Sequence, residues 1–191
     1  MKYTQLGIQG LLLVEPTIYS DERGYFCETY RQSEMERELG YAARFVQENQ
    51  SSSCRGVLRG IHLQLGQEAQ AKLVRCVVGR IIDVAVDLRV ESPTFGQHIA
   101  VELSEDNHCQ LFIPRGFGHA FLSLSDRVVF QYKVDNLYAP RAECCIQYND
   151  PQLAIDWQGM AKGVSPFILS PKDLSGISLD EYQKIVTSKP Q

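Results

Sequence analysis

The chain has 191 residues, of which 44% are hydrophobic and 22% charged, as expected for one globular domain with its own core. Its formal net charge of -4 disfavours a nucleic-acid-binding protein, and an anionic ligand would need a local basic cluster. No apolar run approaches a membrane span, and the early run at 11–14 is too short for the core of a signal peptide. We therefore expect a cytoplasmic protein whose six cysteines, none in a C-x-x-C pair, are reduced thiols.

The N-terminal quarter predicts short extended segments and one helix. Residues 10–17 are expected to be extended, residues 21–24 form a turn by composition, and residues 25–30 continue as a short strand. Ser33 precedes Glu36 at the spacing of a capping box, and Gly40 is a helix stop, so a short helix is predicted over 33–40. Residues 45–49 predict a strand, followed by a serine-rich loop at 51–53.

From residue 58 to residue 148 the pattern is that of an all-β protein. Strands are predicted at 58–64, 73–78, 82–89, 98–103, 110–113, 119–124, 128–134 and 144–148, with turn residues between them. The stretch 82–89 alternates apolar residues with Asp83, Ala85 and Asp87, which predicts a strand with one buried face. Such short strands indicate a sandwich or barrel. Residues 151–176 are expected to be a loop, and Ser178 is expected to cap a last helix to about residue 186.

The stretch 56–64 carries the first candidate for chemistry, His62. On a strand, alternate side chains share a face, so Leu58, Gly60, His62 and Gln64 are predicted to point one way. Arg59, Ile61 and Leu63 are then predicted to point the other way. An imidazole and an amide beside a glycine resemble the floor of a small-molecule pocket. Taken alone, however, a histidine among apolar residues is more often structural than catalytic.

The segment Pro114-x-Gly116-x-x-His119 resembles the second motif of the cupins, in which the histidine binds a metal. At the first motif this chain has His62-Leu63-Gln64 followed by Lys72, where cupins have a second histidine and a glutamate. An ammonium group repels a divalent cation, so we predict a site without metal or cofactor that attracts anions through Lys72. The resemblance implies an all-β, cupin-type double-stranded β-helix, or jelly roll, with a few short peripheral helices.

A wider set of segments resembles the dTDP-4-dehydrorhamnose 3,5-epimerase family over about residues 13–173. The matching segments are 21–28, 47–49, 57–62, 71–75, 83–89, 92–96, 113–117, 132–133 and 169–173. The departures are small. Gly118 and Ala120 flank His119 where the family usually has Ala and Gly, and Ile61 replaces a Leu. They remove no chemical group, although Gly118 and Ala120 could change the shape of the pocket.

The resemblance implies a cofactor-independent epimerase acting at carbons 3 and 5 of a dTDP-linked 4-keto-6-deoxyhexose. The reaction would convert dTDP-4-dehydro-6-deoxyglucose into dTDP-4-dehydrorhamnose. His62 would be the base, since its ordinary pKa lies near working pH, and Asp173 would orient it. Lys72 would stabilise the enolate charge, and Tyr132 would donate a proton on the opposite face. From its own strand, Tyr132 would instead be interpreted as a core residue.

The resemblance also implies how the substrate is held and how the subunits associate. Guanidinium groups suit a diphosphate, and polar or aromatic side chains would contact the rest of the nucleotide sugar. The implied substrate-binding residues are Arg23, Phe26, Glu28, Gln47, Asn49, Arg59, His119, Tyr138, Glu143 and Lys172. The partner chain would be a second copy, in a homodimer that exchanges the N-terminal segment of about residues 1–45. The C-terminal tail, about 151–191, would pack over the barrel.

Three alternatives remain open from the residues. A carbon-3-only epimerase or a ketoisomerase on a related dTDP-4-keto sugar would use the same base, so His62 does not discriminate among them. A non-catalytic nucleotide-sugar binder would need no base, and the presence of both His62 and Asp173 counts against it. A metal-dependent cupin oxygenase is disfavoured by Gln64 and Lys72.

Overall fold

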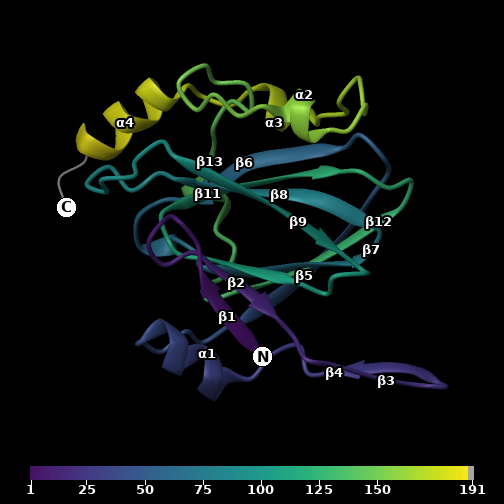
Figure 1. Ribbon diagram of the computed structural model, residues 1–191. Helices are drawn as coiled ribbons and strands as arrows, with labels where there is room; N and C mark the ends of the chain where they lie inside the picture. Colours follow the sequence, from purple (N-terminus) through teal and green to yellow (C-terminus); the bar gives the residue numbers. More distant parts are fainter. Residues whose placement is uncertain (189–191) are drawn as a thin grey trace.

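The computed structural model describes residues 1–188 as two antiparallel sheets that face each other, with helices at the periphery (Figure 1). The six-stranded sheet contains, in spatial order, β1 (Lys2–Gln5), β2 (Leu12–Glu15), β10 (Gln110–Ile113), β7 (Lys72–Val78), β12 (Val128–Val134) and β5 (Gln47–Ser53). The five-stranded sheet contains β13 (Glu143–Cys145), β6 (Leu58–Gln64), β11 (Phe117–Ser123), β8 (Arg80–Asp87) and β9 (His98–Ser104). This is the predicted jelly roll.

Apolar side chains fill much of the space between the two sheets. The rings of Phe121 on β11 and Phe130 on β12 stack across it with their centroids 4.4 Å apart. Val74 and Cys76 on β7 belong to the same buried cluster, as does Ala85 on β8. Because side chains alternate along a strand, positions two residues from these also face this interior. This cluster therefore fixes which polar residues point between the sheets.

A second apolar cluster covers the outer face of the five-stranded sheet. Residues 153–186 lie over this face (Figure 1) and contribute Leu153, Trp157, Val164, Leu179 and Tyr182 to the cluster. The segment contains α2 (Trp157–Met160), α3 (Pro171–Leu174) and α4 (Leu179–Ser188), so the prediction of an unbroken loop over 151–176 is wrong. Ser178 accepts from the backbone N–H of Glu181, as its predicted capping role requires.

The covered sheet also corrects the prediction of a half-buried strand at 82–89. Strand β8 lies inside the five-stranded sheet, with the interior on one face and the C-terminal segment on the other. Asp83 and Asp87, which the alternation placed on an exposed face, are both fully buried. Both faces of this strand are buried, so neither face is exposed to solvent. Alternation of polar and apolar residues alone therefore predicts the wrong environment for the two aspartates.

The N-terminal region differs from its predicted boundaries at several places. Helix α1 (Gln32–Leu39) begins after Arg31, without a side-chain cap, so Ser33 lies inside the helix and the predicted capping box is wrong. Gly40 ends the helix with a φ of 74°, as predicted. The buried Met35 packs against Leu12 and other residues of the six-stranded sheet, and this contact rather than a cap positions the helix.

Strands β3 (Ile18–Asp21) and β4 (Gly24–Cys27) form a separate two-stranded hairpin that projects from the body (Figure 1). The predicted strand at 25–30 therefore ends early, and the predicted loop at 51–53 is instead the end of β5. Two short 3-10 helices, η1 (Gly66–Glu68) and η2 (Pro140–Ala142), lie in loops. None of the helices described is long and apolar enough to cross a membrane.

Candidate active site

His62 lies on β6, directly opposite His119 of the neighbouring strand β11. The pairing of these strands shifts in register before Phe121, and Leu58 packs in the outer cluster together with Ile61 and Leu63. The prediction that Leu58 shares a face with His62 is therefore wrong. The irregularity falls at Gly60, where a Cβ would stand 2.5 Å from that of Ala120. A glycine is required by this close approach of two strands.

The same irregularity turns Arg59 toward the six-stranded sheet. Its Nε donates to Ser53 Oγ at 3.1 Å, and its Nη2 donates to the carbonyl of Ser52 at 3.3 Å, both on β5. The guanidinium is otherwise exposed. Arg59 thus lies on the same side of β6 as His62, contrary to the prediction from simple alternation, and its positive charge lies beside β5 of the opposite sheet.

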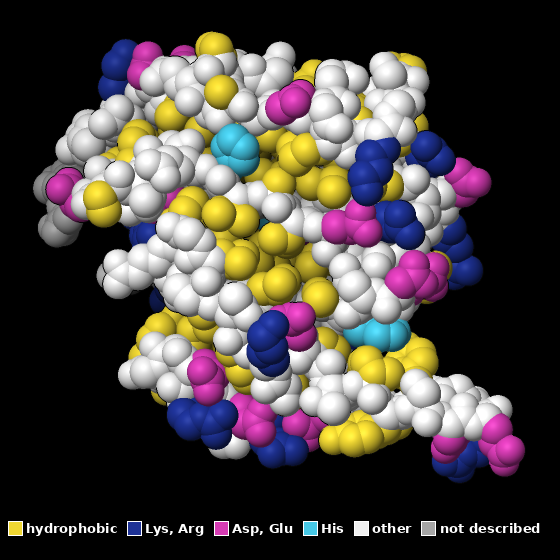
Figure 2. Space-filling view, in the orientation of Figure 1, with side chains coloured by type: hydrophobic (Ala, Val, Ile, Leu, Met, Phe, Trp, Pro, Cys, Tyr) yellow, Lys and Arg dark blue, Asp and Glu magenta, His cyan; other side chains and the backbone are white. Residues whose placement is uncertain are grey.

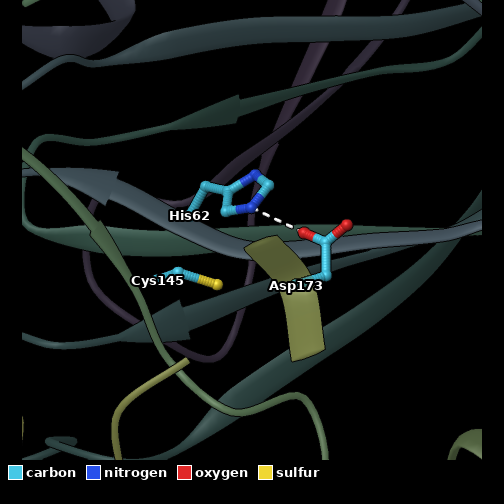
Figure 3. A group of neighbouring side chains, drawn as sticks. All are labelled: His62, Cys145 and Asp173. Atoms are coloured by element: carbon cyan, nitrogen blue, oxygen red, sulfur yellow. Dashed lines mark ion pairs between the residues drawn. The ribbon is translucent and has the colours of Figure 1, made fainter. Parts of the chain in front are cut away.

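Asp173 lies against His62 from the C-terminal segment (Figure 3). His62 Nε2 is 2.7 Å from Asp173 Oδ1, and the aspartate side chain is only 4% exposed. Gly60 donates its backbone N–H to Oδ1 at 3.2 Å, and the Ser170 hydroxyl donates to Oδ2 at 2.6 Å. Ser170 and Asp173 form the capping box of α3, so one carboxylate both starts a helix and faces the imidazole.

These surroundings set the charges of the pair. Burial is the main cause that lowers the pKa of His62 to about 4, and Asp173 opposes it only in part. Burial acts to raise the pKa of Asp173, but hydrogen bonds from Ser170 and Gly60, together with His62, lower it overall. At neutral pH the pair is therefore a neutral imidazole and a carboxylate. Because Nε2 faces the carboxylate, we assign its proton there, which leaves the lone pair on Nδ1.

A second buried group surrounds Lys72, whose side chain is on the same face of β7 as Val74 and points into the interior. Burial lowers the pKa of Lys72 to about 8, while Asp83 opposes the shift. Asp83 Oδ2 is 2.9 Å from His119 Nε2, and Asp83 Oδ1 has no hydrogen-bond partner among residues 1–188. Sequence reasoning missed Asp83. Ala85, a small residue between two aspartates, was the one sign that this face is not exposed.

Tyr132 enters the same interior from the opposite sheet. It shares a face of β12 with Phe130, and their ring centroids are 5.7 Å apart. Phe130 in turn stacks on His119 at 5.7 Å, and His119 pairs with His62. His62 and Tyr132 therefore face each other from two different sheets. Burial and the charge of Glu143 raise the pKa of Tyr132, so its phenol keeps its proton at neutral pH.

Polar residues line the edge of this interior. Asn49 on β5 pairs in register with Tyr132, and Gln47 donates to the Asn49 side chain at 2.8 Å. Tyr138 donates its hydroxyl to Glu143 at 2.8 Å, and Glu143 also contacts the ammonium of Lys172. The structure thus brings these predicted binding residues to the edge of the interior that contains His62 and Tyr132.

Three predicted binding residues lie away from this edge in their own chain. Arg23 is paired with Asp21 at the turn of the projecting hairpin, and Phe26 on the same hairpin is 68% exposed. Glu28 is paired with Arg31 at 2.8 Å. Figure 2 shows the hairpin projecting from the body, with charged side chains at its tip. Tyr25 of the hairpin contacts His108 of the body, with the ring centroids 4.5 Å apart. Within one chain, these side chains are remote from His62.

The cupin metal position is occupied by groups that do not suit a cation. Gln64 donates to the carbonyls of Glu68 and Leu137 and accepts from the N–H of Ala139 at 2.6 Å, so its amide joins two loops. Lys72 is the buried ammonium described above. A different set, His62 with Cys145 and Asp173, brings potential ligand atoms within 4.8 Å of one another. Sequence reasoning missed Cys145, because its position depends on the pairing of β13 with β6.

Known proteins share both the sequence and the fold. The family model described as dTDP-4-dehydrorhamnose 3,5-epimerase matches residues 5–181. The dTDP-4-dehydrorhamnose 3,5-epimerase of Escherichia coli (strain K12) is 49% identical over 185 residues, which cover 97% of this chain and 98% of that protein. The chain belongs to the dTDP-4-dehydrorhamnose 3,5-epimerase family. It is accordingly an isomerase of the epimerase type.

Two solved structures bear on the ligand. The dTDP-6-deoxy-D-glucose-3,5-epimerase of Legionella pneumophila Philadelphia 1, in complex with dTDP-4-keto-L-rhamnose, is 46% identical with a TM-score of 0.88 and covers 94% of this chain and 93% of its own. ChmJ, a 3'-monoepimerase from Streptomyces bikiniensis in complex with dTDP-quinovose, is 35% identical with a TM-score of 0.87 and covers 94% and 89%. Epimerases with this fold thus differ in which sugar carbons they invert: the first is a 3,5-epimerase and the second a 3'-monoepimerase.

Proposed function

We propose that the chain epimerises a dTDP-linked 4-keto-6-deoxyhexose at carbons 3 and 5, converting dTDP-4-dehydro-6-deoxyglucose into dTDP-4-dehydrorhamnose. Both carbons flank the carbonyl at carbon 4, so one enolate oxygen is common to both steps. A single base and a single cation can therefore serve both carbons in turn. The observation that carries the proposal is the placement of His62 with Asp173 on one side of the interior and Tyr132 on the other.

In the first step, the Nδ1 lone pair of His62 removes the proton from the carbon next to the carbonyl. Asp173 holds Nε2–H and stabilises the imidazolium as it forms. The ammonium of Lys72 lies in a buried site, where it stabilises the developing negative charge on the enolate oxygen more strongly than it would in water. These three residues account for formation of the enolate without a cofactor.

In the second step, a proton must reach the opposite face of the same carbon. The phenol of Tyr132 is protonated at neutral pH, because burial and Glu143 raise its pKa. It projects from β12, across the interior from β6, so it can donate where His62 cannot. Before the next carbon is inverted, the His62 imidazolium releases its proton to solvent and the Tyr132 phenolate takes up a proton from solvent, so the net proton count is unchanged. A base and an acid on opposite sides of one ring are what inversion requires.

The test is to incubate the enzyme with dTDP-4-keto-6-deoxyglucose in heavy water and to follow the sugar ring by NMR. We expect deuterium at carbons 3 and 5, and a product with the rhamnose configuration. The His62→Ala variant should incorporate no deuterium into the substrate. The control variant His98→Ala should incorporate deuterium as the parent enzyme does. An enzyme that neither exchanges nor epimerises this substrate would refute the proposal and would favour a binder.

A second candidate function is epimerisation at carbon 3 alone. The likeness to ChmJ, a 3'-monoepimerase, is the observation that favours it. The same residues would then act on one carbon, so the site does not distinguish the two functions by its groups. The labelling experiment does, because a carbon-3 epimerase would leave carbon 5 unlabelled and unchanged in configuration.

We also propose that the active site is completed by a second copy of the chain in a homodimer. Arg23 and Phe26 lie on a hairpin that is remote from the site of its own chain. A guanidinium group is suited to the diphosphate of the substrate. Strand β2 is hydrogen-bonded to β10 of the same chain, and β1 is hydrogen-bonded to β2, so the proposal concerns the hairpin Ile18–Cys27 and Glu28 beside it.

A further inference from the structure

Cys145 is a thiol beside His62, the proposed base, and the proposed mechanism gives it no role. It lies on β13, two residues beyond Glu143, and pairs in register with His62. Figure 3 shows its sulfur directed toward Asp173 and the Nε2 side of the imidazole. Within residues 1–188, the sulfur makes a single long hydrogen bond, to the carbonyl of Ile146 at 3.7 Å. The thiol therefore faces the pair and takes no part in holding it.

His62 Nε2 is incompletely satisfied. It lies 2.7 Å from Asp173 Oδ1, yet within residues 1–188 it is a buried atom without a well-aligned hydrogen-bond partner. Potential ligand atoms of His62, Cys145 and Asp173 all lie within 4.8 Å of one another. They come from three separate elements, β6, β13 and α3, whose backbone positions are fixed by sheet pairing and by a helix cap. A buried nitrogen, a thiol and a carboxylate thus converge on one point.

We propose that Zn²⁺, or another divalent cation with an affinity for thiolate, binds to His62 Nε2, Cys145 Sγ and Asp173 Oδ1 and inhibits the enzyme. Nitrogen, sulfur and carboxylate oxygen are the three ligand types of zinc in proteins. Bond lengths of about 2.0–2.3 Å around a tetrahedral ion place ligand atoms about 3.3–3.8 Å apart. His62 Nε2 and Asp173 Oδ1, which are 2.7 Å apart, need to separate by at least about 0.6 Å around the ion. The sulfur of Cys145, within 4.8 Å of them, needs to approach by about 1 Å, and a water molecule can take the fourth position.

The charges balance when the ion binds. Zn²⁺ displaces the thiol proton of Cys145 to solvent, so a thiolate and the carboxylate of Asp173 offset its two positive charges. Nearby, Lys172 is already paired with Glu143, which limits its repulsion of the cation. Lys72 is the remaining positive group near His62. This site differs from the cupin metal position, which would use residues 64 and 72.

The inhibition follows from the tautomer of His62, and this part of the inference rests on the proposed function. A metal ion on Nε2 takes the position of the Nε2 proton, so the proton of the neutral ring must reside on Nδ1. The lone pair that removes the substrate proton is then lost. The ion also occupies Asp173 Oδ1 and so removes the group that stabilises the imidazolium. One bound ion therefore blocks the base without touching the substrate.

Cobalt(II) tests binding independently of turnover. Added to the purified native enzyme, Co²⁺ should produce a thiolate-to-metal charge-transfer band and the intense visible bands of tetrahedral cobalt, and Zn²⁺ should displace it. Cys145→Ser should lose the charge-transfer band while keeping its turnover. Cys144→Ala is the matched control, because the neighbouring Cys144 belongs to the outer cluster, and it should keep the band. A band that persists in Cys145→Ser, or no band at all, would overturn the site.

Turnover tests the inhibition. Zn²⁺ should slow epimerisation reversibly, a chelator should restore it, and Mg²⁺ at the same concentration should have no effect. Cys145→Ser should require at least about tenfold more Zn²⁺ for half-inhibition, because a serine hydroxyl is a poor ligand. Cobalt binding without any loss of turnover would overturn the inhibition. A chain that binds cobalt through Cys145 but epimerises nothing would instead refute the proposed function and leave the metal site standing.

Discussion

His62 and Lys72 have opposite requirements for protonation, and their surroundings shift both pKa values downward. In the proposed mechanism the base His62 must be neutral, so activity should rise as the pH increases through its pKa, about 4. Lys72 must be charged, so activity should fall as the pH increases through its pKa, about 8. We therefore expect kcat/KM for the free enzyme to be highest between about pH 4 and about pH 8, as a pH series of initial rates would measure.

Two variants assign the alkaline side of that profile. Arg is charged at all accessible pH values, so Lys72→Arg should retain residual activity that no longer falls near pH 8. The negative charge of Asp83 raises the pKa of Lys72 and so opposes the effect of burial. Asp83→Asn removes that charge, so the pKa of Lys72 should fall further and the alkaline loss of activity should move to lower pH. An alkaline fall that both variants leave unchanged would assign it to another group.

Tyr132 separates the two proton transfers. Tyr132→Phe deletes the hydroxyl and keeps the ring, so His62 and Lys72 should still form the enolate. In heavy water the base then returns deuterium to the face from which it took the proton. We expect deuterium incorporation with retained configuration, while epimerisation falls by about a hundred- to ten-thousandfold. NMR of the recovered substrate measures both. Epimerisation at near the parent rate would make Tyr132 an ordinary core aromatic, as its strand pattern suggests.

The candidate residues were predictable to different degrees. His62 and Lys72 stand at the positions of a recognisable motif, whereas Tyr132 is singled out by the family resemblance alone, because its strand pattern predicts a core residue. Asp83 and Cys145 were missed because their importance comes from neighbours far away in the chain, through strand pairing and burial. Sequence spacing contains no information on these contacts. Ser170 had a usable signal, because Ser-Pro-Lys-Asp has the spacing of a capping box.

Among the elements, β6 and β11 are coupled through Ile61 and Gly118. A Cβ added at Gly118 would stand 2.4 Å from Ile61 Cγ2 and 2.8 Å from Leu88 Cδ1. Ile61, Leu88 and Ala120 belong to the outer cluster. The departures at 61, 118 and 120 therefore affect packing beneath the C-terminal segment. An isoleucine at 61 uses the space that an alanine at 118 would need.

This coupling predicts that Ile61→Leu has opposite effects on stability in two backgrounds: it destabilises the parent protein and stabilises the Gly118→Ala variant. Gly118→Ala alone should lower the free energy of unfolding by about 1–3 kcal/mol through overpacking. Ile61→Leu alone should cost less than about 1.5 kcal/mol, and because leucine lacks the γ2 methyl, the double variant should recover about 1 kcal/mol of the alanine's cost. Urea denaturation of the four proteins gives the coupling energy. Additive losses would contradict the steric explanation, and kcat should be similar in all four.

Element boundaries followed sequence rules wherever local chemistry decides them. Gly40 ends α1 and Ser178 caps α4, because a left-handed residue and a hydroxyl cap act within one helical turn. The start of α1 and the two buried faces of β8 were mispredicted, because tertiary packing decides them. At Gly60 the side chains of β6 change faces because the pairing with β11 shifts in register there. The sequence of β6 alone carries no information about that pairing.

For the whole molecule, the projecting hairpin is the feature that one chain leaves unexplained. Tyr19, Tyr25 and Phe26 on it are 64%, 60% and 68% exposed, although an isolated two-stranded hairpin is marginally stable in water. Large exposed aromatic groups beside charged ones are typical of a surface that is covered by a partner. A twofold dimer would cover both hairpins at once, each against the neighbouring chain.

Mixing two inactive variants tests the shared site. Arg23→Ala has a defective hairpin and an intact base, whereas His62→Ala has the reverse. If the hairpin serves the neighbouring chain, a heterodimer contains one site with both residues intact and one site with neither. Free exchange of subunits makes half of the dimers mixed, so about one quarter of the parent activity should return. If the hairpin serves its own chain, every site lacks one residue and nothing returns.

The controls make either result decisive. Subunits are first dissociated and reassembled, and heterodimers are verified by tagging one variant and isolating the mixed species. Arg37→Ala, which removes another exposed arginine in the N-terminal segment, should be fully active by itself. Verified heterodimers without recovery would refute the shared site, because Arg23 would then act within its own chain or not at all. Recovery near one quarter would mean that neither chain alone contains a complete active site, so activity should be lost whenever the dimer dissociates.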